Sequence, residues 1–222
     1  MVIAIDGLAG SGKSTLAVLV AKSLNFHFFN TGLVFRAIAY ALDKNGILQS
    51  DDNKIKQFLE KSPIKVKFDK FKQQVFYENI NISKFLKSAK IAKLASTYSQ
   101  IIFVREYVEQ IQKNFAKNNN VVIEGRDIGT KVFPKAKYKF FITASLTERA
   151  KRRYISQSEK THFSIEEIKR QLQDRDYSDI NRKISPLIKA DDAISIDTTN
   201  DTIQQSLNKI LSYIRWALCF FG

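Results

Sequence analysis

The chain has 222 residues, of which 44% are hydrophobic and 26% charged, which excludes an intrinsically disordered protein and fits one domain. One cysteine and two widely separated histidines exclude a disulfide framework and argue against a structural zinc site. The formal net charge of +14 favours anionic partners, but the lysines are scattered, so we expect small phosphorylated ligands and no nucleic acid.

Strands and helices alternate along most of the chain. The apolar, β-branched run 2–5 predicts a buried strand, and apolar residues at helical spacing predict a helix over 14–24. The same patterns predict further strands over 26–29, 121–123, 138–143 and 193–196, and further helices over 31–44, 50–63, 88–99, 103–118, from 145, from 164 and from 202 to about 220. Asn45-Gly46 predicts the end of the second helix, and capping boxes are expected at Ser145 and Ser164.

One segment departs from this alternation. Ile64, Val66 and Phe68 alternate with lysines, and the short apolar steps that follow predict a small β segment with a turn near Asn79. We interpret residues 63–86 as an insertion into an α/β fold. The rest of the chain predicts a three-layer α/β/α arrangement around a central parallel sheet, in which ligands bind at the carboxyl ends of the strands.

The ends of the chain predict neither a leader nor a membrane anchor. The apolar run 2–5 is too short for a signal peptide, and glycine, serine and lysine follow it. No apolar run approaches the roughly 20 residues of a membrane span, and we interpret the apolar tail 216–222 as the end of a packed helix. We therefore expect a soluble cytoplasmic protein.

The stretch GLAGSGKS at 7–14 matches the phosphate-binding pattern G-x-x-x-x-G-K-[ST] between a strand and a helix. Glycines let the backbone curl so that N–H groups point inward, and the helix N-terminus adds partial positive charge. Lys13 can reach the β and γ phosphates, and the Ser14 hydroxyl can coordinate Mg²⁺. The stretch predicts a P-loop for a nucleoside triphosphate, and we expect ATP with Mg²⁺.

Other residues narrow the class of P-loop protein. The base-reading motif Asn-Lys-x-Asp of GTPases does not occur. The strand 121–123 ends in Glu-Gly-Arg-Asp rather than in the paired acidic residues typical of motor ATPases, and this arginine suits a second anion better than a hydrolytic water. The pattern favours a small kinase.

Three stretches combine arginines with short polar residues: 30–36, 124–130 and 175–182. Thr31 is placed to cap a helix, and Arg175, Asp179 and Arg182 have the spacing of one helix face. Each stretch alone is also compatible with a surface salt bridge. Together with the P-loop they predict an arginine-lined pocket opposite the donor phosphates.

The chain resembles bacterial cytidylate kinase, from the first strand to the last and in order. The residues that carry the resemblance are GLAGSGKST, NTGLVFR, VRE at 104–106, GRDIGTKVFPKAKYKFFITASLTERAKRR and RDYSDINRKISPLIKADDAISIDT. The resemblance implies a single P-loop kinase domain over 1–222. Its parts would be a core at 1–62 and 87–222, a nucleoside monophosphate (NMP)-binding insert at 63–86 and a helical lid at 149–176.

The resemblance also implies roles for individual residues. The donor and its Mg²⁺ would be held by Gly7, Leu8, Ala9, Gly10, Ser11, Gly12, Lys13, Ser14 and Thr15, with the metal on the Ser14 hydroxyl. The residues implied in catalysis are Lys13, Arg126, Arg149 and Arg153, and Arg152 would join the two lid arginines in closing over the phosphoryl group. The acceptor would be bound by Thr31, by Arg36, Arg126 and Arg182 around its phosphate, by Arg175 and Asp179 at the ribose, and by Ser96, Arg105 and Asp127 at the base.

Hydrogen-bond chemistry agrees with cytosine as the base. Its amino group donates to an acidic side chain such as Asp127, and its O2 and N3 accept from Arg105. Uracil would set an acceptor against Asp127, which costs about 1–3 kcal/mol and gives a preference rather than an absolute bar.

Three positions depart from the family pattern as we interpret it. Asn30 stands where Asp is usual, Phe35 where Tyr is usual, and Glu124 where Asp is frequent. These changes put fine specificity and rate in doubt rather than the reaction class.

The function hypothesis is transfer of the ATP γ-phosphoryl group to CMP or dCMP by a monomer that needs no membrane or nucleic acid. A P-loop kinase for UMP, AMP or a small metabolite such as shikimate is the first alternative. A nucleic-acid-stimulated ATPase, suggested by the net charge, is the second.

Overall fold

The structure is a computed structural model that describes residues 1–61, 64–69, 71–157 and 163–220. The described residues form two compact units. The first joins Met1–Leu24 to the chain from Val122 onward, and the second spans Asn25–Val121.

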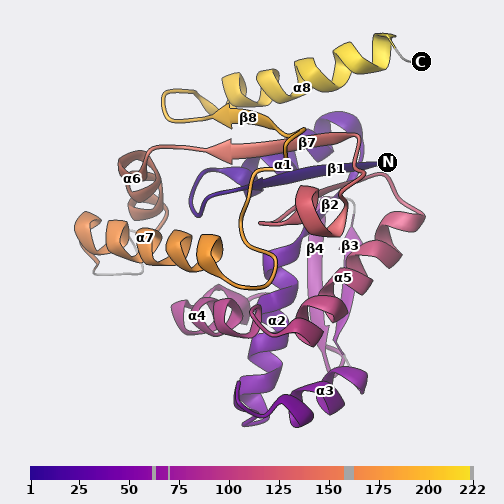
Figure 1. Cartoon of the computed structure of the whole chain (residues 1–222), viewed down its shortest axis with the longest axis vertical. Helices are drawn as coiled ribbons and strands as arrows, with labels where there is room; N and C mark the ends of the chain where they lie inside the picture. The colour runs from indigo at the N-terminus through magenta and orange to yellow at the C-terminus, as the bar shows by residue number, and fades with distance from the viewer. Residues whose placement is uncertain (62–63, 70, 158–162, 221–222) are drawn as a thin grey trace. The chain divides into compact units, whose positions relative to one another are not determined.

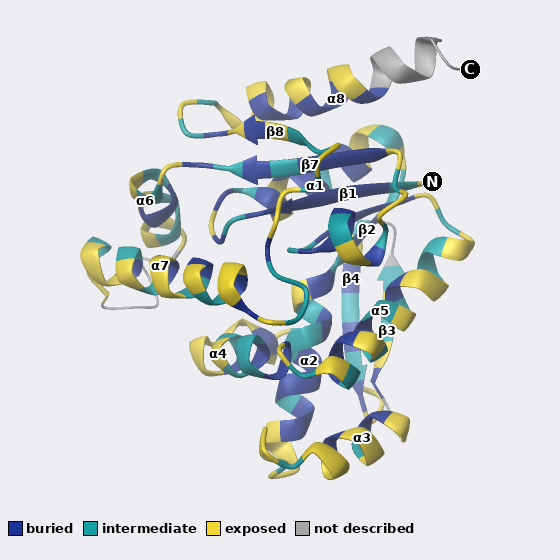
Figure 2. Ribbon diagram, viewed as in Figure 1, coloured by how far each residue is buried: buried dark blue, intermediate teal, exposed yellow. Residues whose placement is uncertain are grey.

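A parallel sheet forms the centre of the first unit (Figure 1). Its strands lie in the order β6, β1, β7, β8, with bounds Val121–Glu124, Val2–Gly7, Tyr138–Thr143 and Ile194–Asp197. β1 pairs with β7 from Ile3 opposite Tyr138 to Gly7 opposite Ile142. β1 and β6 are almost entirely buried and β7 mostly so (Figure 2), which agrees with their near-continuous apolar runs, whereas only Ile196 is buried in β8.

Helices flank this sheet. They are α1 (Lys13–Leu24), α6 (Leu146–Gln157), α7 (Ile165–Asn181) and α8 (Ile203–Phe220), with a short π-helical turn, η2 (Ile128–Val132), after β6. α1 packs against α8, and α6 packs against α7. The arrangement confirms the predicted P-loop-type α/β fold class with a central parallel sheet.

The second unit combines helices with a separate antiparallel sheet. Its elements are β2 (His27–Asn30), α2 (Thr31–Lys44), α3 (Asp52–Glu60), β3 (Lys65–Asp69), β4 (Lys72–Tyr77), β5 (Ile80–Asn81), the 3₁₀ turn η1 (Phe85–Lys87), α4 (Ala89–Tyr98) and α5 (Ile102–Lys117). The sheet has the order β3-β4-β5. Three phenylalanine rings from β2, β3 and α5 pack together, with 3.8 Å between the centroids of Phe68 and Phe115 and 5.2 Å between those of Phe29 and Phe68.

Local sequence signals have mixed outcomes. α2 ends at Lys44 as predicted, and the β4–β5 turn falls at Glu78 and Asn79, which both have positive φ. The Ser164 capping box is present. Only one of the two bonds of the capping box expected at Ser145 forms: the Ser145 hydroxyl accepts the Glu148 N–H. The other is wrong, because the Glu148 carboxylate accepts from Arg152 instead.

The predicted core, insert and lid boundaries stay predictions. The small sheet lies within 63–86, and α6 and α7 carry the two ends of the predicted lid, 149–176. Residues 62–63 and 158–162 and the last two residues of the apolar tail lie outside the described residues. Within the described part of the chain, no helix is long and apolar enough to cross a bilayer.

Candidate active site

The loop between β1 and α1 needs its glycines for reasons of backbone geometry. Gly7, Gly10 and Gly12 all have positive φ, at 140°, 75° and 88°. A Cβ on Gly7 would also lie 2.0 Å from the main-chain oxygen of Ile142 on β7. The loop therefore has the left-handed backbone positions that a phosphate-binding nest requires.

Lys13 is the first residue of α1 and is buried in the loop. Its Nζ donates to the main-chain oxygen of Leu8 at 2.6 Å. Burial is the larger cause and the nearby positive charge of Arg126 the second cause of a lowered Lys13 pKa, which is about 7. An anion bound beside Lys13 would therefore stabilise its charged ammonium form.

Ser14 and Glu124 could together hold a divalent cation. The Ser14 hydroxyl donates to Glu124 Oε1 at 2.8 Å, and Glu124 is buried at the carboxyl end of β6. A hydroxyl and one carboxylate fit Mg²⁺, which takes few protein oxygens and completes its shell with water and substrate phosphates. The residues that the structure describes contain no group of three or more His, Cys, Asp or Glu side chains that could hold a metal ion by themselves.

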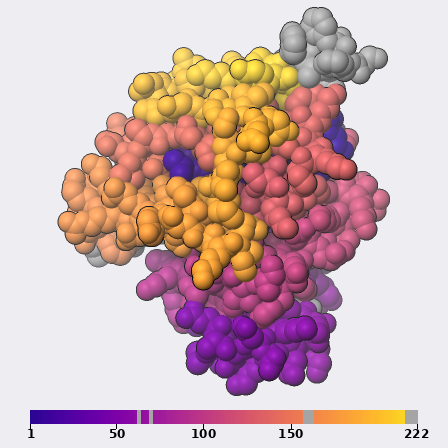
Figure 3. Space-filling view, viewed as in Figure 1, coloured from indigo at the N-terminus to yellow at the C-terminus, as the bar shows by residue number. Residues whose placement is uncertain are grey.

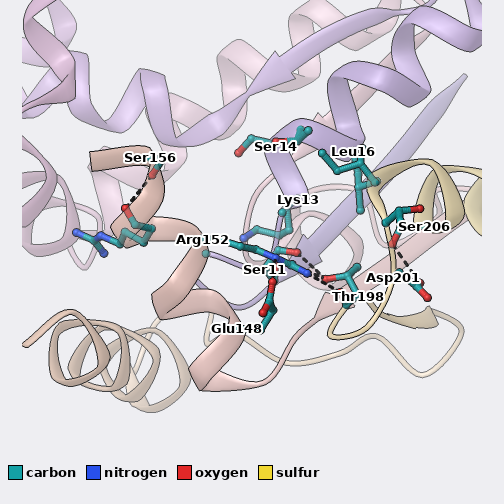
Figure 4. A pocket seen from close by; sticks show the side chains of 16 residues that line it. Ser11, Lys13, Ser14, Leu16, Glu148, Arg152, Ser156, Thr198, Asp201 and Ser206 are labelled. Carbon is teal, nitrogen blue, oxygen red and sulfur yellow. Dashed lines mark hydrogen bonds and ion pairs between the residues drawn. The ribbon is translucent and has the colours of Figure 1, made fainter. Parts of the chain in front are cut away.

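A cavity of about 590 Å³ opens beside the loop (Figure 4). It is lined by Gly10–Leu16, by Glu148, Arg152, Arg153 and Ser156 of α6, by Thr198, Asp201 and Thr202 of the β8–α8 connection, and by Ile203 and Ser206 of α8. The Arg152 guanidinium donates to the Thr198 hydroxyl at 2.9 Å, and that hydroxyl lies 3.2 Å from the main-chain oxygen of Ser11. The loop, α6 and the β8–α8 connection are thus joined at one wall of the cavity.

Sequence reasoning missed the contribution of the β8–α8 connection. The signal was present, because Thr198 follows the last strand directly, and the carboxyl ends of parallel strands are where ligands bind.

Three arginines surround the carboxylate of Asp179 on α7. Arg126 Nε donates to it at 2.9 Å, Arg182 Nη1 lies 3.6 Å away, and Arg175 Nε lies 3.8 Å away. Burial alone would raise the pKa of Asp179, but the three guanidinium groups hold it below its usual value. The excess positive charge makes this cluster suited to an additional anion.

The predicted helical spacing of this cluster is wrong at one end. α7 ends at Asn181, and Arg182 has extended backbone angles beyond it. Its guanidinium reaches back to Asp179 and also lies 3.7 Å from Asp127, with both side chains buried. The turn after the helix, rather than the helix face, places Arg182 in the cluster.

Asp6, which sequence reasoning did not assign, positions the chain that follows Arg126 and Asp127. Its buried carboxylate accepts the N–H groups of Ile128 at 2.9 Å and Gly129 at 2.7 Å. Burial raises the pKa of Asp6 to about 6, although the two N–H groups oppose the rise. An acidic residue ending an otherwise apolar strand was the available sequence signal.

The second unit positions Thr31 and Asn30 through two glutamines. The Gln73 side chain on β4 accepts the Asn30 N–H at 2.6 Å and donates to the Asn30 carbonyl at 3.2 Å. Gln112 on α5 donates to the Thr31 hydroxyl at 2.7 Å. The first turn of α2 is therefore fixed by neutral side chains.

The other predicted acceptor residues of the second unit also have defined contacts. Arg36 donates to the main-chain oxygen of Leu86 at 3.4 Å. Arg105 is buried and donates to the main-chain oxygen of Ser99 at 2.8 Å. The Ser99 hydroxyl in turn donates to the main-chain oxygen of Ser96 at 2.8 Å. Ser96 and Arg105, both predicted to read the base, thus share the same local network.

Comparisons with known proteins identify the family. The family model described as cytidylate kinase matches residues 3–216. A cytidylate kinase of Leuconostoc mesenteroides is 39% identical over 219 residues, which cover 98% of each chain. One of Fusobacterium nucleatum is 41% identical over 211 residues, covering 95% of each chain. The chain belongs to the cytidylate kinase family.

A solved structure agrees with the fold of this family member. The TT1252 protein of Thermus thermophilus superposes with a TM-score of 0.50 at 15% identity, and the match covers 98% of this chain and 97% of the other.

The three departures from the expected cytidylate kinase pattern each have a local role. The expectation that Thr31 caps α2 is wrong, because Thr31 is the first residue of the helix and its hydroxyl accepts from Gln112. Asn30 is the cap: its Oδ1 accepts the Leu33 N–H at 2.9 Å, as an Asp would. The Phe35 ring lies 5.5 Å from the Arg105 guanidinium, a cation–π contact that needs no hydroxyl. Glu124 reaches the Ser14 hydroxyl. The departures are therefore compatible with a working site.

The predicted site residues fall into two groups. The first unit holds the loop from Gly7 to Thr15, the α6 arginines and the Asp179 cluster, and the second unit holds Thr31, Arg36, Ser96 and Arg105. The roles of all these residues, and the meeting of the second group with the acceptor phosphate, stay predictions.

Proposed function

We propose that the chain transfers the γ-phosphoryl group of ATP to CMP or dCMP, giving CDP or dCDP and ADP. The observation that supports this most directly is the presence of two anion-suited sites in one unit. The loop around Lys13 is one, and the Asp179 cluster is the other. Arg126 of that cluster is close enough to Lys13 to lower its pKa.

In this proposal the loop binds the donor. Lys13 neutralises the β and γ phosphates, and the N-terminus of α1 adds partial positive charge. Ser14 and Glu124 would hold Mg²⁺, which would supply further neutralisation of the negative charge on the donor phosphates. The cavity beside the loop has room for the rest of the nucleotide, with Arg152 and Arg153 at its wall.

The acceptor phosphate is assigned to Arg126 and Arg182, with Arg36 joining them from the second unit. Asp179 and Arg175 are assigned to the ribose, and the base to Ser96, Arg105 and Asp127. Little covalent chemistry is asked of the protein, because holding donor and acceptor in line and neutralising charge account for most of phosphoryl-transfer catalysis. No side chain is required as a general base.

Asp127 is the residue proposed to prefer cytosine. A buried carboxylate accepts a hydrogen bond from the cytosine amino group, whereas it repels the uracil O4, which is also an acceptor. The proposal includes a monomeric, cytoplasmic enzyme that works without a membrane or nucleic-acid partner.

A substrate panel tests the proposal. ADP release would be measured with ATP, Mg²⁺ and CMP, dCMP, UMP, AMP, GMP or shikimate, with a sample lacking acceptor as the control. We expect CMP or dCMP to give the highest kcat/KM, and CDP or dCDP to appear in equal amount to ADP. A higher kcat/KM for another acceptor would show that the proposed substrate is wrong. ADP release stimulated by DNA or RNA alone would show that the proposed reaction is wrong.

A further inference from the structure

We propose that Asp176 and Arg149 are positioning residues that hold the P-loop at Ala9 and so set its affinity for the donor triphosphate. The inference deepens the proposed function and rests on it. In this inference Arg149 binds the main chain of the loop, whereas the resemblance implied that it contacts the transferring phosphoryl group.

Both main-chain polar groups of Ala9 are bound by this pair. The Ala9 N–H donates to Asp176 Oδ1 at 3.0 Å, and the Ala9 carbonyl accepts from Arg149 Nη1 at 3.0 Å. Arg149 Nη1 also donates to Asp176 Oδ2, and Arg149 Nε donates to the carbonyl of Ala144 at 3.0 Å. These four bonds use both carboxylate oxygens and leave the guanidinium directed at the loop's main chain.

The pair is buried, with Arg149 5% and Asp176 8% exposed, and Ala9 is 4% exposed. The Ala9 side chain packs in an apolar cluster with Ala150, Ile168 and Leu172 of α6 and α7. In the space-filling view only a few indigo atoms of the N-terminal segment appear between the salmon and orange atoms of later parts of this unit (Figure 3). Ala9 is therefore enclosed by α6 and α7 rather than free in solvent.

Electrostatics explains why two charged residues occur here. A lone carboxylate behind an anion-binding loop would repel the phosphates and would be costly to bury. Arg149 neutralises it, so the loop gains a strong acceptor for the Ala9 N–H without net negative charge. A Cβ on the next residue, Gly10, would make only an ordinary van der Waals contact with Cβ of Arg149, at 3.4 Å.

The two residues also stand at the two ends of the predicted lid, on α6 and α7. Their ion pair joins these ends to each other and to the loop. The pair therefore connects α6 and α7 directly to the main chain of Ala9.

The test measures binding of MgATP without acceptor, and of CMP alone, by titration calorimetry on the full chain. Asp176→Leu removes the acceptor of the Ala9 N–H. We expect its Kd for MgATP to rise about tenfold or more, which is the loss of one buried hydrogen bond to a charged group, while the Kd for CMP changes less than about twofold. Ile210→Ala, at a buried position of α8, controls for lost stability and should leave both constants within about twofold.

A second variant separates positioning from stability. Arg149→Met combined with Asp176→Leu removes both charges, so its melting temperature should exceed that of Asp176→Leu. Its Kd for MgATP should stay raised about tenfold or more, because Ala9 still has no partner. Recovery of MgATP affinity together with stability would overturn the inference, as would a Kd for MgATP within about twofold of wild type in Asp176→Leu.

If Asp176→Leu fails to fold, Asp176→Asn decides. Its amide oxygen can still accept the Ala9 N–H but no longer pairs with Arg149 as an ion, so we expect a rise of about three- to fivefold for MgATP alone. An unchanged Kd for MgATP, or an equal rise for CMP, would overturn the inference. The proposed function fails separately, if wild type binds MgATP but transfers nothing to CMP or dCMP.

Discussion

The P-loop and the Asp179 cluster both suit anions, but they are built in opposite ways. The loop is a contiguous stretch whose binding capacity comes from main-chain groups and positive-φ glycines. The cluster brings three arginines from two distant segments around one carboxylate. The first is a property of backbone geometry, and the second is a balance of side-chain charges.

This difference has consequences for substitution. In the loop a single side chain, Lys13, supplies a full positive charge, and main-chain N–H groups supply the other contacts to an anion. In the cluster each arginine is supported by Asp179, so that removing one leaves the others paired. We therefore expect loss of function to be steeper at the loop than at the cluster.

The largest effect is expected for Lys13→Ala. It removes the positive charge that neutralises the β and γ phosphates, and we expect kcat to fall by about 10³-fold or more with CMP as acceptor. Lys22→Ala, an exposed change on the same helix, is the matched control and should keep wild-type kcat. If Lys13→Ala retains a tenth of wild-type activity, the loop does not carry the contribution assigned to it.

Arg182→Ala should have a smaller and more selective effect. Loss of one buried guanidinium should lower kcat/KM for CMP by about 100-fold, while the Kd for MgATP changes less than about twofold. Steady-state kinetics with varied CMP and calorimetry with MgATP measure the two quantities. Lys183→Ala, at the exposed neighbouring position, should match wild type. Equal losses of donor and acceptor affinity would show that the cluster is not a separate acceptor site.

Asp6→Asn sharpens the comparison at the point where loop and cluster adjoin, through pH. The folded-state pKa of Asp6 is about 6, above the unfolded value of 3.8, so its stabilising effect is present below about 3.8 and lost as pH rises through 6. We expect the unfolding free energy of wild type minus that of Asp6→Asn to fall by about 2–3 kcal/mol between pH 4 and pH 7. Urea unfolding across this range measures it, and a pH-independent difference contradicts it.

Asp127→Ala should have the smallest effect, confined to the choice of base. We expect the CMP-to-UMP ratio of kcat/KM to shrink about tenfold, since an unpaired acceptor costs about 1–3 kcal/mol. Asp174→Ala, an exposed change on α7, is the control. An unchanged ratio in Asp127→Ala would mean that the base is read elsewhere.

The fold class and the loop could be predicted because their signals are local. Hydrophobic periodicity indicated the strands and helices, and spacing within 7–14 indicated the loop. The C-terminal end of α2 and the β4–β5 turn also follow from one or two residues each.

The rest of the site depends on contacts between residues far apart in sequence. Asp6 binds the main chain 122 and 123 residues away, and Asp176 binds Ala9 across 167 residues. No spacing rule indicates such partners, because they depend on how α6, α7 and η2 pack. Competition between partners also matters: the Glu148 carboxylate binds Arg152 rather than capping α6, since a guanidinium is within reach four residues later.

The first glycine of the loop is closed to mutation for a reason that has nothing to do with nucleotides. At Gly7 a neighbouring strand's carbonyl fills the space where any side chain would begin. Even a descendant of this protein that had abandoned phosphate chemistry would have to keep that glycine, or give up the pairing of β1 with β7. A glycine kept at this position in a diverged sequence would therefore indicate that the sheet is preserved, and would not by itself indicate that the catalytic activity is.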